Sequence, residues 1–405
     1  MAEVRSVTVG FWVGSGSRDE SDGIAGASHF LEHLLFKGTE TRSAASIAEA
    51  LDEVVGDCNA YTTKEYTAFY VRLLSEHLPL GLDILSEIMW GPALRPADLD
   101  AERTVILDEI LMHADEPADL VVERCFGALF PGHPLGRDAL GTAESVGDIT
   151  VADVRGFFEQ HYRPENMVVS VAGDCDHDDV ARAVEERFTG RTGGGAPERS
   201  APAQPAEPLV VLHRPTEQAH LTLAVRSVSR FDDDRWALSV LNHVLGGGMS
   251  SRLFQKVREQ RGLAYSIGSE RQAYQDAGSL CVVVGTAPEY VDEVLGIVSG
   301  ELGLLASEGV SERELAVAKG NLRAEMLLAC EDSGARMSRI GAGLLLHGEV
   351  KPVDEILARI EAVDLDDVHR VARLLVEEPH ALAVVGPFDP DTFDGAALGL
   401  AGHVA

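Results

Sequence analysis

The feature that most constrains the fold is an internal repeat. Residues 149–174, ITVADVRGFFEQHYRPENMVVSVAGD, read as a short helix, a turn marked by proline and an apolar strand. Residues 363–389, VDLDDVHRVARLLVEEPHALAVVGPFD, repeat that order near the end of the second half. The strand VTVGFWVG at 7–14 likewise has a counterpart, LTLAVRS, at 221–227. Two copies of one α/β unit of roughly 190 residues account for this pattern.

A stretch of low complexity separates the two copies. Residues 189–208, TGRTGGGAPERSAPAQPAEP, are rich in Gly, Pro, Ala and Ser and offer almost nothing to bury, so we expect a flexible connection. We therefore predict an N-terminal domain over 1–190, a linker over 191–208 and a homologous C-terminal domain over 209–405. A chain of 405 residues exceeds the size at which one hydrophobic core stops growing, which agrees with two domains.

Strands and helices alternate within the first half. The patterns predict a strand over 5–14, helices over about 26–37 and 45–55, a hairpin over 59–74, and helices near 75–90 and 97–114. Strands that mix with helices and return antiparallel are typical of the α+β class. The predicted fold is two homologous α/β sandwich domains, each an antiparallel-rich sheet with helices on one face.

Charge and composition exclude several classes of function. The chain has 34 basic and 66 acidic residues, a formal net charge of −32, which argues against nucleic acids and anionic membrane surfaces as partners. Neither a signal peptide nor an apolar run of membrane-spanning length is evident. The cysteines are odd in number and widely spaced, as for reduced thiols. We therefore predict a cytoplasmic protein.

A metal-binding pattern occurs at residues 26–38, GASHFLEHLLFKG. The leucines supply an apolar helical face, with Ser28 as an expected N-cap and Gly38 as the stop. His29 and His33 are four residues apart, so both imidazoles lie on one face at a spacing suited to one tetrahedral zinc ion. Glu32 lies on the neighbouring edge, where it is placed to take a proton from metal-bound water.

A second helix supplies candidate acidic ligands. In the predicted helix at 97–114, Glu102 and Glu109 are seven residues apart and share a face, about 10.5 Å apart along the axis. One would ligate the zinc while the other braces a ligand histidine from outside. The spacing alone does not decide which of the two does which.

Together these residues resemble the inverzincin pattern of the pitrilysin family, which includes insulin-degrading enzyme and the mitochondrial processing peptidase. HFLEH is followed, 76 residues after its second histidine, by Glu109 within ERTVILDEI. Four further segments match in order, and they are NAYTTKEYTAFY (59–70), LFPGHPLGRDALGT (129–142), YRPENMVVSVAGD (162–174) and LNHVLGGGMSSRLFQKVREQRGLAYSI (241–267). The resemblance covers nearly the whole chain and implies the two-domain type, half of a clamshell, similar to bacterial processing peptidases.

The resemblance also assigns roles around the metal. It implies one Zn²⁺ per chain held by His29, His33 and Glu109, with Glu32 as general base and Glu102 as an outer carboxylate. It further implies that extended peptide substrates pair with an exposed strand edge formed by Asn59, Ala60, Tyr61 and Thr62.

In the second half the resemblance points to a different group of residues. Arg258 and Tyr265, within VREQRGLAY, match an arginine–tyrosine pair that would hold the substrate carbonyl from the opposite half of the clamshell. Glycines near the substrate path are implied at Gly246, Gly247 and Gly248. Because two domains make half of a clamshell, we expect a homodimer whose two chains complete each other's sites.

The leading hypothesis is therefore a zinc metalloendopeptidase that cleaves peptides or unfolded leader segments inside a closed chamber. The alternative is a non-catalytic scaffold subunit, since some relatives of such peptidases have lost the metal. One departure from the family concerns the first half, where nothing corresponds to the strand LVVLHRP at 209–215. We expect either a shortened N-terminus or a bare edge on the first sheet.

Overall fold

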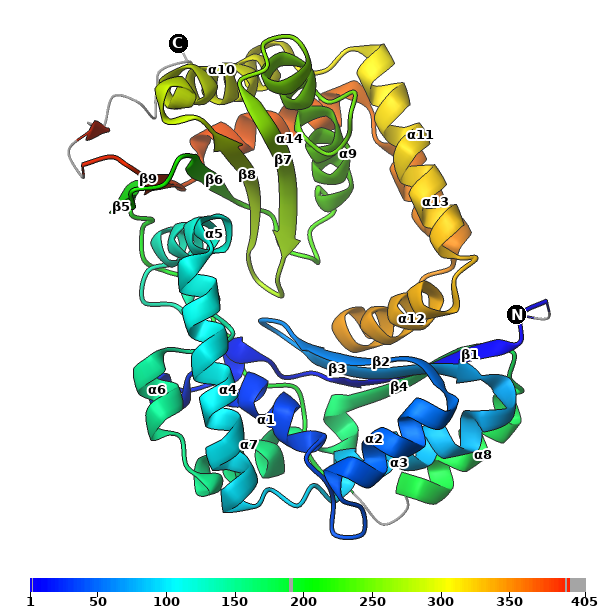
Figure 1. Cartoon of the computed structure of the whole chain (residues 1–405). Helices are drawn as coiled ribbons and strands as arrows, with labels where there is room; N and C mark the ends of the chain where they lie inside the picture. Colours follow the sequence, from blue (N-terminus) through cyan, green and yellow to red (C-terminus); the bar gives the residue numbers. More distant parts are fainter. Residues whose placement is uncertain (2, 189–191, 390–391, 394–405) are drawn as a thin grey trace. The chain divides into compact units, whose positions relative to one another are not determined.

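The computed structural model describes residues 1, 3–188, 192–389 and 392–393. The chain divides into two compact units. Unit 1 comprises Met1–Leu111, Arg137–Arg199 and Leu327–Lys351, and unit 2 comprises Met112–Gly136, Ser200–Met326 and Pro352–Ala405. Both units combine an antiparallel-rich sheet with helices (Figure 1), which confirms the predicted α+β class.

The sheet of unit 1 has the strand order β2-β3-β1-β4. Its strands are β1 (Ser6–Val13), β2 (Val55–Thr62), β3 (Thr67–Leu74) and β4 (Met167–Gly173), and all its pairs are antiparallel. Side chains of β1 alternate between the two faces, as the pleat requires. Val7, Val9 and Phe11 point into the main core of the unit, whereas Trp12 joins a separate cluster on the other face.

Several helices cover the face of the unit 1 sheet that carries Phe11. They are α1 (Ala27–Leu35), α2 (Ala44–Val54), α3 (Leu78–Trp90), the first part of α4 (Pro96–Asp115), α6 (Ala143–Asp148), α7 (Val151–His161) and α8 (His177–Phe188). Fully burying one side chain such as Phe30 or Leu34 of α1 contributes about 1.5–3 kcal/mol. This core fixes the position of α1, which carries the metal-binding pattern.

The opposite face of the same sheet is covered by α12 (Ser333–His347), which comes from the second half of the chain (Figure 1). The approach is close, because a Cβ on Gly10 would lie 2.2 Å from Met337 Sδ and one on Gly341 would lie 2.1 Å from Trp12 Nε1. Thr8 Oγ1 and Ser333 Oγ are 2.8 Å apart in a hydrogen bond. The sheet therefore has helices on both faces, and the prediction of helices on one face is wrong.

The sheet of unit 2 has the order β5-β9-β6-β8-β7. Its strands are β5 (Leu209–His213), β6 (Ala219–Ser227), β7 (Ala264–Ala273), β8 (Gly278–Thr286) and β9 (His380–Gly386). Within the described residues, β5 with β9 is the only parallel strand pair. Strand β5 contains the LVVLH segment for which the first half showed no equivalent, and the unit 1 sheet accordingly ends at β4 in the part that the structure describes.

The helices of unit 2 also occupy both faces of its sheet. One face carries α9 (Arg235–Leu245), α10 (Val291–Glu308) and α14 (Leu365–Glu377), with α11 (Glu312–Ala329) and α13 (Val353–Ala362) beside them. On the other face lies α5 (Pro117–Leu129) from the first half of the chain, packed on β6 and β9 through Cys125 and its neighbours.

Each half of the chain thus gives one helix to the other unit. The unit boundaries fall inside α4, at Leu111, and inside α11, at Met326. The contiguous division at 1–190 and 209–405 does not describe this exchange. A sheet that exposes two apolar faces needs two covering layers, and local sequence patterns do not tell from which half the second layer comes.

The segment predicted as a flexible linker makes specific contacts over its described part, residues 192–208. Gly193 N–H donates to Glu165 Oε1 at 2.7 Å and Glu207 N–H donates to Ala128 O at 2.7 Å. The boundary between the units falls directly after Arg199. The composition predicted the absence of a helix or strand here, but the expectation of a loose connection is wrong for this part. Residues 189–191 of the prediction lie outside the described residues.

No single helix in the described part of the chain is long and apolar enough to cross a membrane. By length and composition alone, the segments Pro288–Glu308 and Glu312–Ala329 pass such a test only as a pair bent by 107°.

Candidate metal centre

Helix α1 presents two histidines and a glutamate along one edge. Phe30 and Leu34 are buried in the core of unit 1, so the rotation of the helix about its axis is fixed. This rotation leaves His29, Glu32 and His33 partly exposed. The two imidazole rings lie 4.6 Å apart, centroid to centroid, with an angle of 70° between their planes. The i, i+4 spacing therefore produces the pairing that the sequence predicted.

The N-terminus of α1 is held by a carboxylate from the preceding loop. The N–H groups of Gly26 and Ser28 donate to the two oxygens of Glu20 at 2.8 and 2.7 Å. Burial raises the pKa of Glu20 to about 7 against the opposing effect of these hydrogen bonds. The prediction of Ser28 as the N-cap is wrong, because the N-cap is Gly26 and Glu20 takes the free N–H groups. Glu20 was missed because its contact depends on the path of a loop without a periodic pattern.

Helix α4 brings Glu109 to the two histidines. Glu109 Oε2 lies 3.7 Å from His29 Nε2 and 3.7 Å from His33 Nε2. One ligand atom from each of these three residues lies within 4.8 Å of the other two. Glu109 Oε2 is buried and, among the residues that the structure describes, has no hydrogen-bond partner. Three electron-pair donors thus converge, and one of them, Glu109 Oε2, is left without a hydrogen-bond donor in the described part of the chain.

Glu102 lies on the same helix but contacts the other side of His33. Its Oε2 is 3.0 Å from His33 Nδ1, and its Oε1 is 2.6 Å from Lys37 Nζ. Glu102 is therefore bonded to the nitrogen that faces away from Glu109. This geometry separates the two glutamates that the sequence left as alternatives. Lys37 was not among the predicted residues, although its position one turn after His33 carried a usable signal.

Glu32 is paired with the end of strand β2. Thr62 Oγ1 donates a hydrogen bond to Glu32 Oε2 at 2.5 Å. Burial raises the pKa of Glu32, an effect that the Thr62 hydroxyl and His33 oppose and that Glu109 reinforces. A carboxyl with a raised pKa is a better proton acceptor than an ordinary glutamate. The contact with Thr62 was not predicted, since it joins residues from a helix and a strand far apart in the sequence.

The four predicted substrate residues lie on an edge strand. Among the strands that the structure describes, β2 pairs with β3 on one side only, so its other edge is the rim of the sheet. Asn59 is exposed and Ala60 half-buried, whereas the Tyr61 ring makes edge contacts with Trp12 and Tyr66. An edge strand of this kind offers main-chain groups to an added strand.

Arg258 and Tyr265 are brought together in unit 2. Arg258 lies in a π-helical turn, Phe254–Glu259, and Tyr265 lies on β7. The Arg258 guanidinium carbon is 4.8 Å from the centroid of the Tyr265 ring, and that tyrosine is 80% exposed. The predicted pair is therefore a contacting pair, and it belongs to a different unit from the histidines.

The three predicted glycines follow α9 and are explained by packing. A Cβ on Gly246 would lie 2.6 Å from Ser269 N, and one on Gly247 would lie 2.8 Å from His243 Cα. A Cβ on Gly248 would lie 3.0 Å from the His243 ring. The backbone turns tightly against α9 and β7 at this point. A role of these glycines in substrate binding stays a prediction.

Comparison with known proteins defines the class to which this fold and cluster belong. The family model described as Insulinase (Peptidase family M16) matches residues 2–143, and that described as Peptidase M16 inactive domain matches residues 148–322. The chain belongs to this insulinase family of peptidases, which confirms the resemblance drawn from its motifs.

Similar proteins agree over nearly the full length. An uncharacterized zinc protease of Mycobacterium tuberculosis is 43% identical over 389 residues, covering 95% of this chain and 89% of the relative. One from Bacillus subtilis is 38% identical, covering 95% and 94%. Among solved structures, a protease from Helicobacter pylori has a TM-score of 0.86 at 22% identity, covering 94% of each chain. The peptidase M16 inactive domain from Pseudomonas fluorescens has a TM-score of 0.89 at 21% identity, covering 96% and 94%.

Proposed function

We propose that the chain is a zinc-dependent metalloendopeptidase. His29, His33 and Glu109 bind the metal, Glu32 is the general base, and Glu102 braces His33. The observation that carries the proposal is the convergence, within 4.8 Å, of one carboxylate oxygen from α4 and two imidazole nitrogens from α1, the helix that also presents Glu32. The names of the relatives, which include zinc and protease, support the same conclusion.

The three donors suit zinc. Two histidines and one carboxylate form a common catalytic set that leaves a fourth position open. Donors at the usual zinc distances lie roughly 3.3–3.5 Å apart in a tetrahedral site. The 3.7 Å separations here are close to that value, and the unsatisfied Glu109 Oε2 is explained by a metal partner. When bound, zinc supplies a Lewis acid that polarises the peptide carbonyl and lowers the pKa of water.

Glu32 handles the proton of the reaction. Its raised pKa favours taking a proton from the attacking water, and the same carboxyl then returns that proton to the leaving amine nitrogen. Thr62 holds Oε2 by its hydrogen bond, so Oε1 is the oxygen that accepts the proton. Glu102 acts on His33, since its bond to Nδ1 fixes the tautomer in which Nε2 is the free electron-pair donor.

The substrate is a peptide in extended form. It adds as a strand to the free edge of β2, where main-chain hydrogen bonds give affinity with little sequence preference. The residues that receive it are Asn59, Ala60, Tyr61 and Thr62. Because Thr62 ends this strand and also bonds to Glu32, the scissile bond would lie beside the general base.

The proposal includes a homodimer with shared sites. Arg258 and Tyr265 would hold the substrate carbonyl in the site of the other chain, a role that fits the exposure of Tyr265 and its stacking with Arg258. Two inactive chains, H29A and R258A/Y265A, should regain cleavage when co-assembled, because each mixed dimer rebuilds up to one intact site. Verified mixed dimers that show no recovery would contradict this part of the proposal.

A scaffold role without catalysis is the alternative. The inactive-domain model covers residues 148–322, whereas the converging residues lie between His29 and Glu109. All three donors and the base are present, which favours catalysis. Zinc analysis combined with cleavage of a mixed peptide library tests both ideas. We expect one zinc per chain and mapped cleavage sites, and zinc without cleavage of any peptide would favour the scaffold role.

A further inference from the structure

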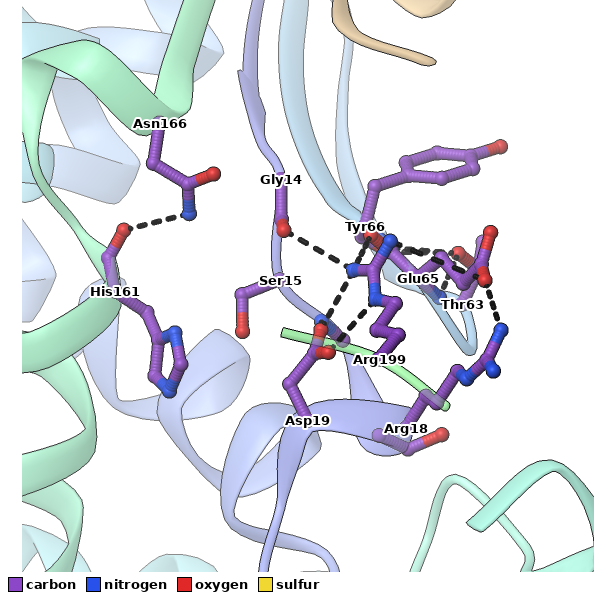
Figure 2. A network of polar contacts seen from close by, with 12 residues as sticks. Gly14, Ser15, Arg18, Asp19, Thr63, Glu65, Tyr66, His161, Asn166 and Arg199 are labelled. Carbon is purple, nitrogen blue, oxygen red and sulfur yellow. Dashed lines mark hydrogen bonds and ion pairs between the residues drawn. The ribbon is translucent and has the colours of Figure 1, made fainter. Parts of the chain in front are cut away.

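Arg199 stands out because it is a charged residue from the linker that is buried inside unit 1. Its side chain is 7% exposed, although the segment around it is composed of small and polar residues. Nε and Nη2 donate to the two oxygens of Asp19, each at 2.8 Å. Nη2 also contacts Gly14 O at 3.2 Å and Glu65 O at 2.8 Å. Figure 2 shows the guanidinium between these groups.

The partners of Arg199 belong to two structural features beside the metal centre. Gly14 and Asp19 lie on the chain between β1 and α1, and Glu65 lies in the turn between β2 and β3. Arg18 reaches the same turn, with Nη1 donating to Glu65 Oε1 at 2.5 Å (Figure 2). The Arg199 side chain thus joins the loop that leads to α1 with the turn that follows β2.

The cluster is balanced in charge and buried. The side chains of Arg18, Glu65 and Asp19 are 2%, 2% and 1% exposed. Buried charges are tolerated only when they are paired and hydrogen-bonded. Burial lowers the pKa of the neighbouring His161, and Arg199 adds to this effect while Asp19 opposes it. A lowered pKa favours the neutral form of the histidine, so His161 does not disturb this balance. Two arginines therefore face two carboxylates, and loss of Arg199 would leave a net negative charge.

The turn held by this cluster leads directly to the general base. Backbone bonds add to its attachment, since Ser17 N–H and Arg18 N–H donate to Thr63 O and Lys64 O at 3.1 and 2.8 Å. Thr62, which precedes the turn, donates to Glu32. A shift of the turn would therefore move both the end of β2 and the partner of Glu32.

We propose that Arg199 is a positioning residue for peptide binding, which fixes the β2–β3 turn and so holds the edge of β2 in place for an extended substrate. This inference rests on the proposed function. It gives the linker a role in the reaction beyond joining two domains. The effect should grow with the length of the peptide, because a longer peptide forms more main-chain pairs with β2.

The test compares one cleavable sequence at two lengths. A peptide of about ten residues can pair along the eight residues of β2, whereas one of about four residues cannot. In R199M we expect kcat/KM for the long peptide to fall about tenfold more than kcat/KM for the short peptide, mainly through KM, with zinc content unchanged. R199K should restore part of the difference, because it returns the charge without the bidentate contact.

R187M is the matched control. Arg187 makes a two-nitrogen contact with Asp83 Oδ1 between α8 and α3 of the same unit, at 2.8 and 2.5 Å. Its loss should lower the melting temperature without changing the ratio between long and short peptides. If R199M does not fold, D19N takes its place, and it should lower the same ratio. An unchanged ratio in the folded variants overturns the inference.

Hydrogen exchange separates this inference from the proposed function. In R199M, or D19N if R199M does not fold, the amides of residues 59–66 should exchange faster by about tenfold or more, while R187M leaves them unchanged. Unaltered exchange there overturns the positioning role of Arg199 by itself. A parent chain that cleaves neither peptide overturns the proposed function instead, and faster exchange in the variant would still support the attachment of the turn by Arg199.

Discussion

Helix α1, which follows β1 in unit 1, and helix α9, which follows β6 in unit 2, share one sequence pattern but differ in the polar residues that they carry. In unit 1, α1 reads HFLEHLL over residues 29–35, and in unit 2, α9 reads SVLNHVL over residues 239–245. In this alignment His33 corresponds to His243, while Ser239 and Asn242 stand where unit 1 has His29 and Glu32. The apolar positions are retained in both helices. The fold therefore depends on the apolar face of the helix and tolerates replacement of the chemical groups on its other edge.

The acidic helices differ in the same way. ERTVILDE in α4 aligns with AKGNLRAE in α11, so Glu109 corresponds to Glu325, and Glu102 corresponds to Ala318. Burial lowers the pKa of His243, and the negative charge of Glu325 offsets only part of this effect. At the five aligned positions, unit 2 thus has one histidine and one glutamate, and the other three positions carry a serine, an asparagine and an alanine. This agrees with the inactive-domain description of the model that matches residues 148–322.

The largest effect should come from removing Glu109, the proposed acidic ligand. In E109Q a neutral amide replaces the carboxylate that faces both histidines, and zinc affinity should fall by more than about a hundredfold. The corresponding change in unit 2, E325Q, should leave zinc binding unchanged. Metal titration of both purified variants makes the comparison. Normal zinc binding in E109Q together with its loss in E102Q would exchange the roles of the two glutamates.

A smaller effect is expected from the outer carboxylate. Glu102 contacts His33 and Lys37 but faces away from Glu109, so E102Q should weaken zinc binding by about 10–100-fold. The amide keeps a similar shape, so the melting temperature of the metal-free variant should change little. Zinc affinity equal to that of the parent would mean that the bond to His33 Nδ1 does not position the ligand.

The comparison of α1 with α9 also predicts that a second zinc site can be created in unit 2. The double variant S239H/N242E restores the H-x-x-E-H pattern in α9 beside Glu325, and it should bind a second zinc per chain. We expect this site to be about 10–100-fold weaker than the first, because Ala318 stands where unit 1 has its outer carboxylate. Titration beyond one equivalent, with circular dichroism as a check of folding, gives the answer. A folded variant without a second zinc would show that the two helices are not equivalent in position.

The last comparison concerns the N-terminus of α1, where the free energy of unfolding should depend on pH. The pKa of Glu20 rises from 4.5 to about 7 on folding, so the folded state holds an extra proton between these values. Its contribution to stability is therefore complete below pH 4.5 and is lost as the pH rises to 7, by roughly 3 kcal/mol at most. Denaturant unfolding of the metal-free chain and of E20Q at pH 5 and 8 measures it.

The control for that measurement lies at the start of α9. Asp234 is the N-cap there, but its side chain makes no capping bond and pairs with Arg370 at 2.5 Å. D234N should therefore cost less than about 1 kcal/mol at either pH. If the free energy of unfolding of E20Q follows the pH in parallel with the parent chain, Glu20 is not the proton-binding group.

Local patterns predicted the parts of the site that depend on one helix. The spacing of His29 and His33 places both on one face whatever the rest of the fold does, and the apolar residues between them decide which face is buried. The two glutamates of α4 share a face for the same reason. Which one meets His33 Nε2 depends on the packing of α4 against α1, a tertiary relation that no spacing within α4 contains.

The parts that were missed depend on loops and on exchange between distant segments. Glu20, Lys37 and the Thr62 hydroxyl acquire their roles only when loops and strands are placed beside α1. The linker composition correctly excluded regular structure, but it did not reveal that Arg199 is buried against Asp19. The crossing of α5 and α12 to the other unit was missed because the sequence was divided into contiguous domains.

The most direct test of the account is to measure zinc and cleavage on the same sample of E32Q. Thr62 bonds to Glu32, and Glu32 is not among the three converging donors, so the metal should stay at one zinc per chain. Cleavage of a mapped peptide should fall on the order of a hundredfold or more, because the amide cannot accept the proton of water. Cleavage at the parent rate with normal zinc would contradict the assignment of Glu32 and with it the proposed mechanism.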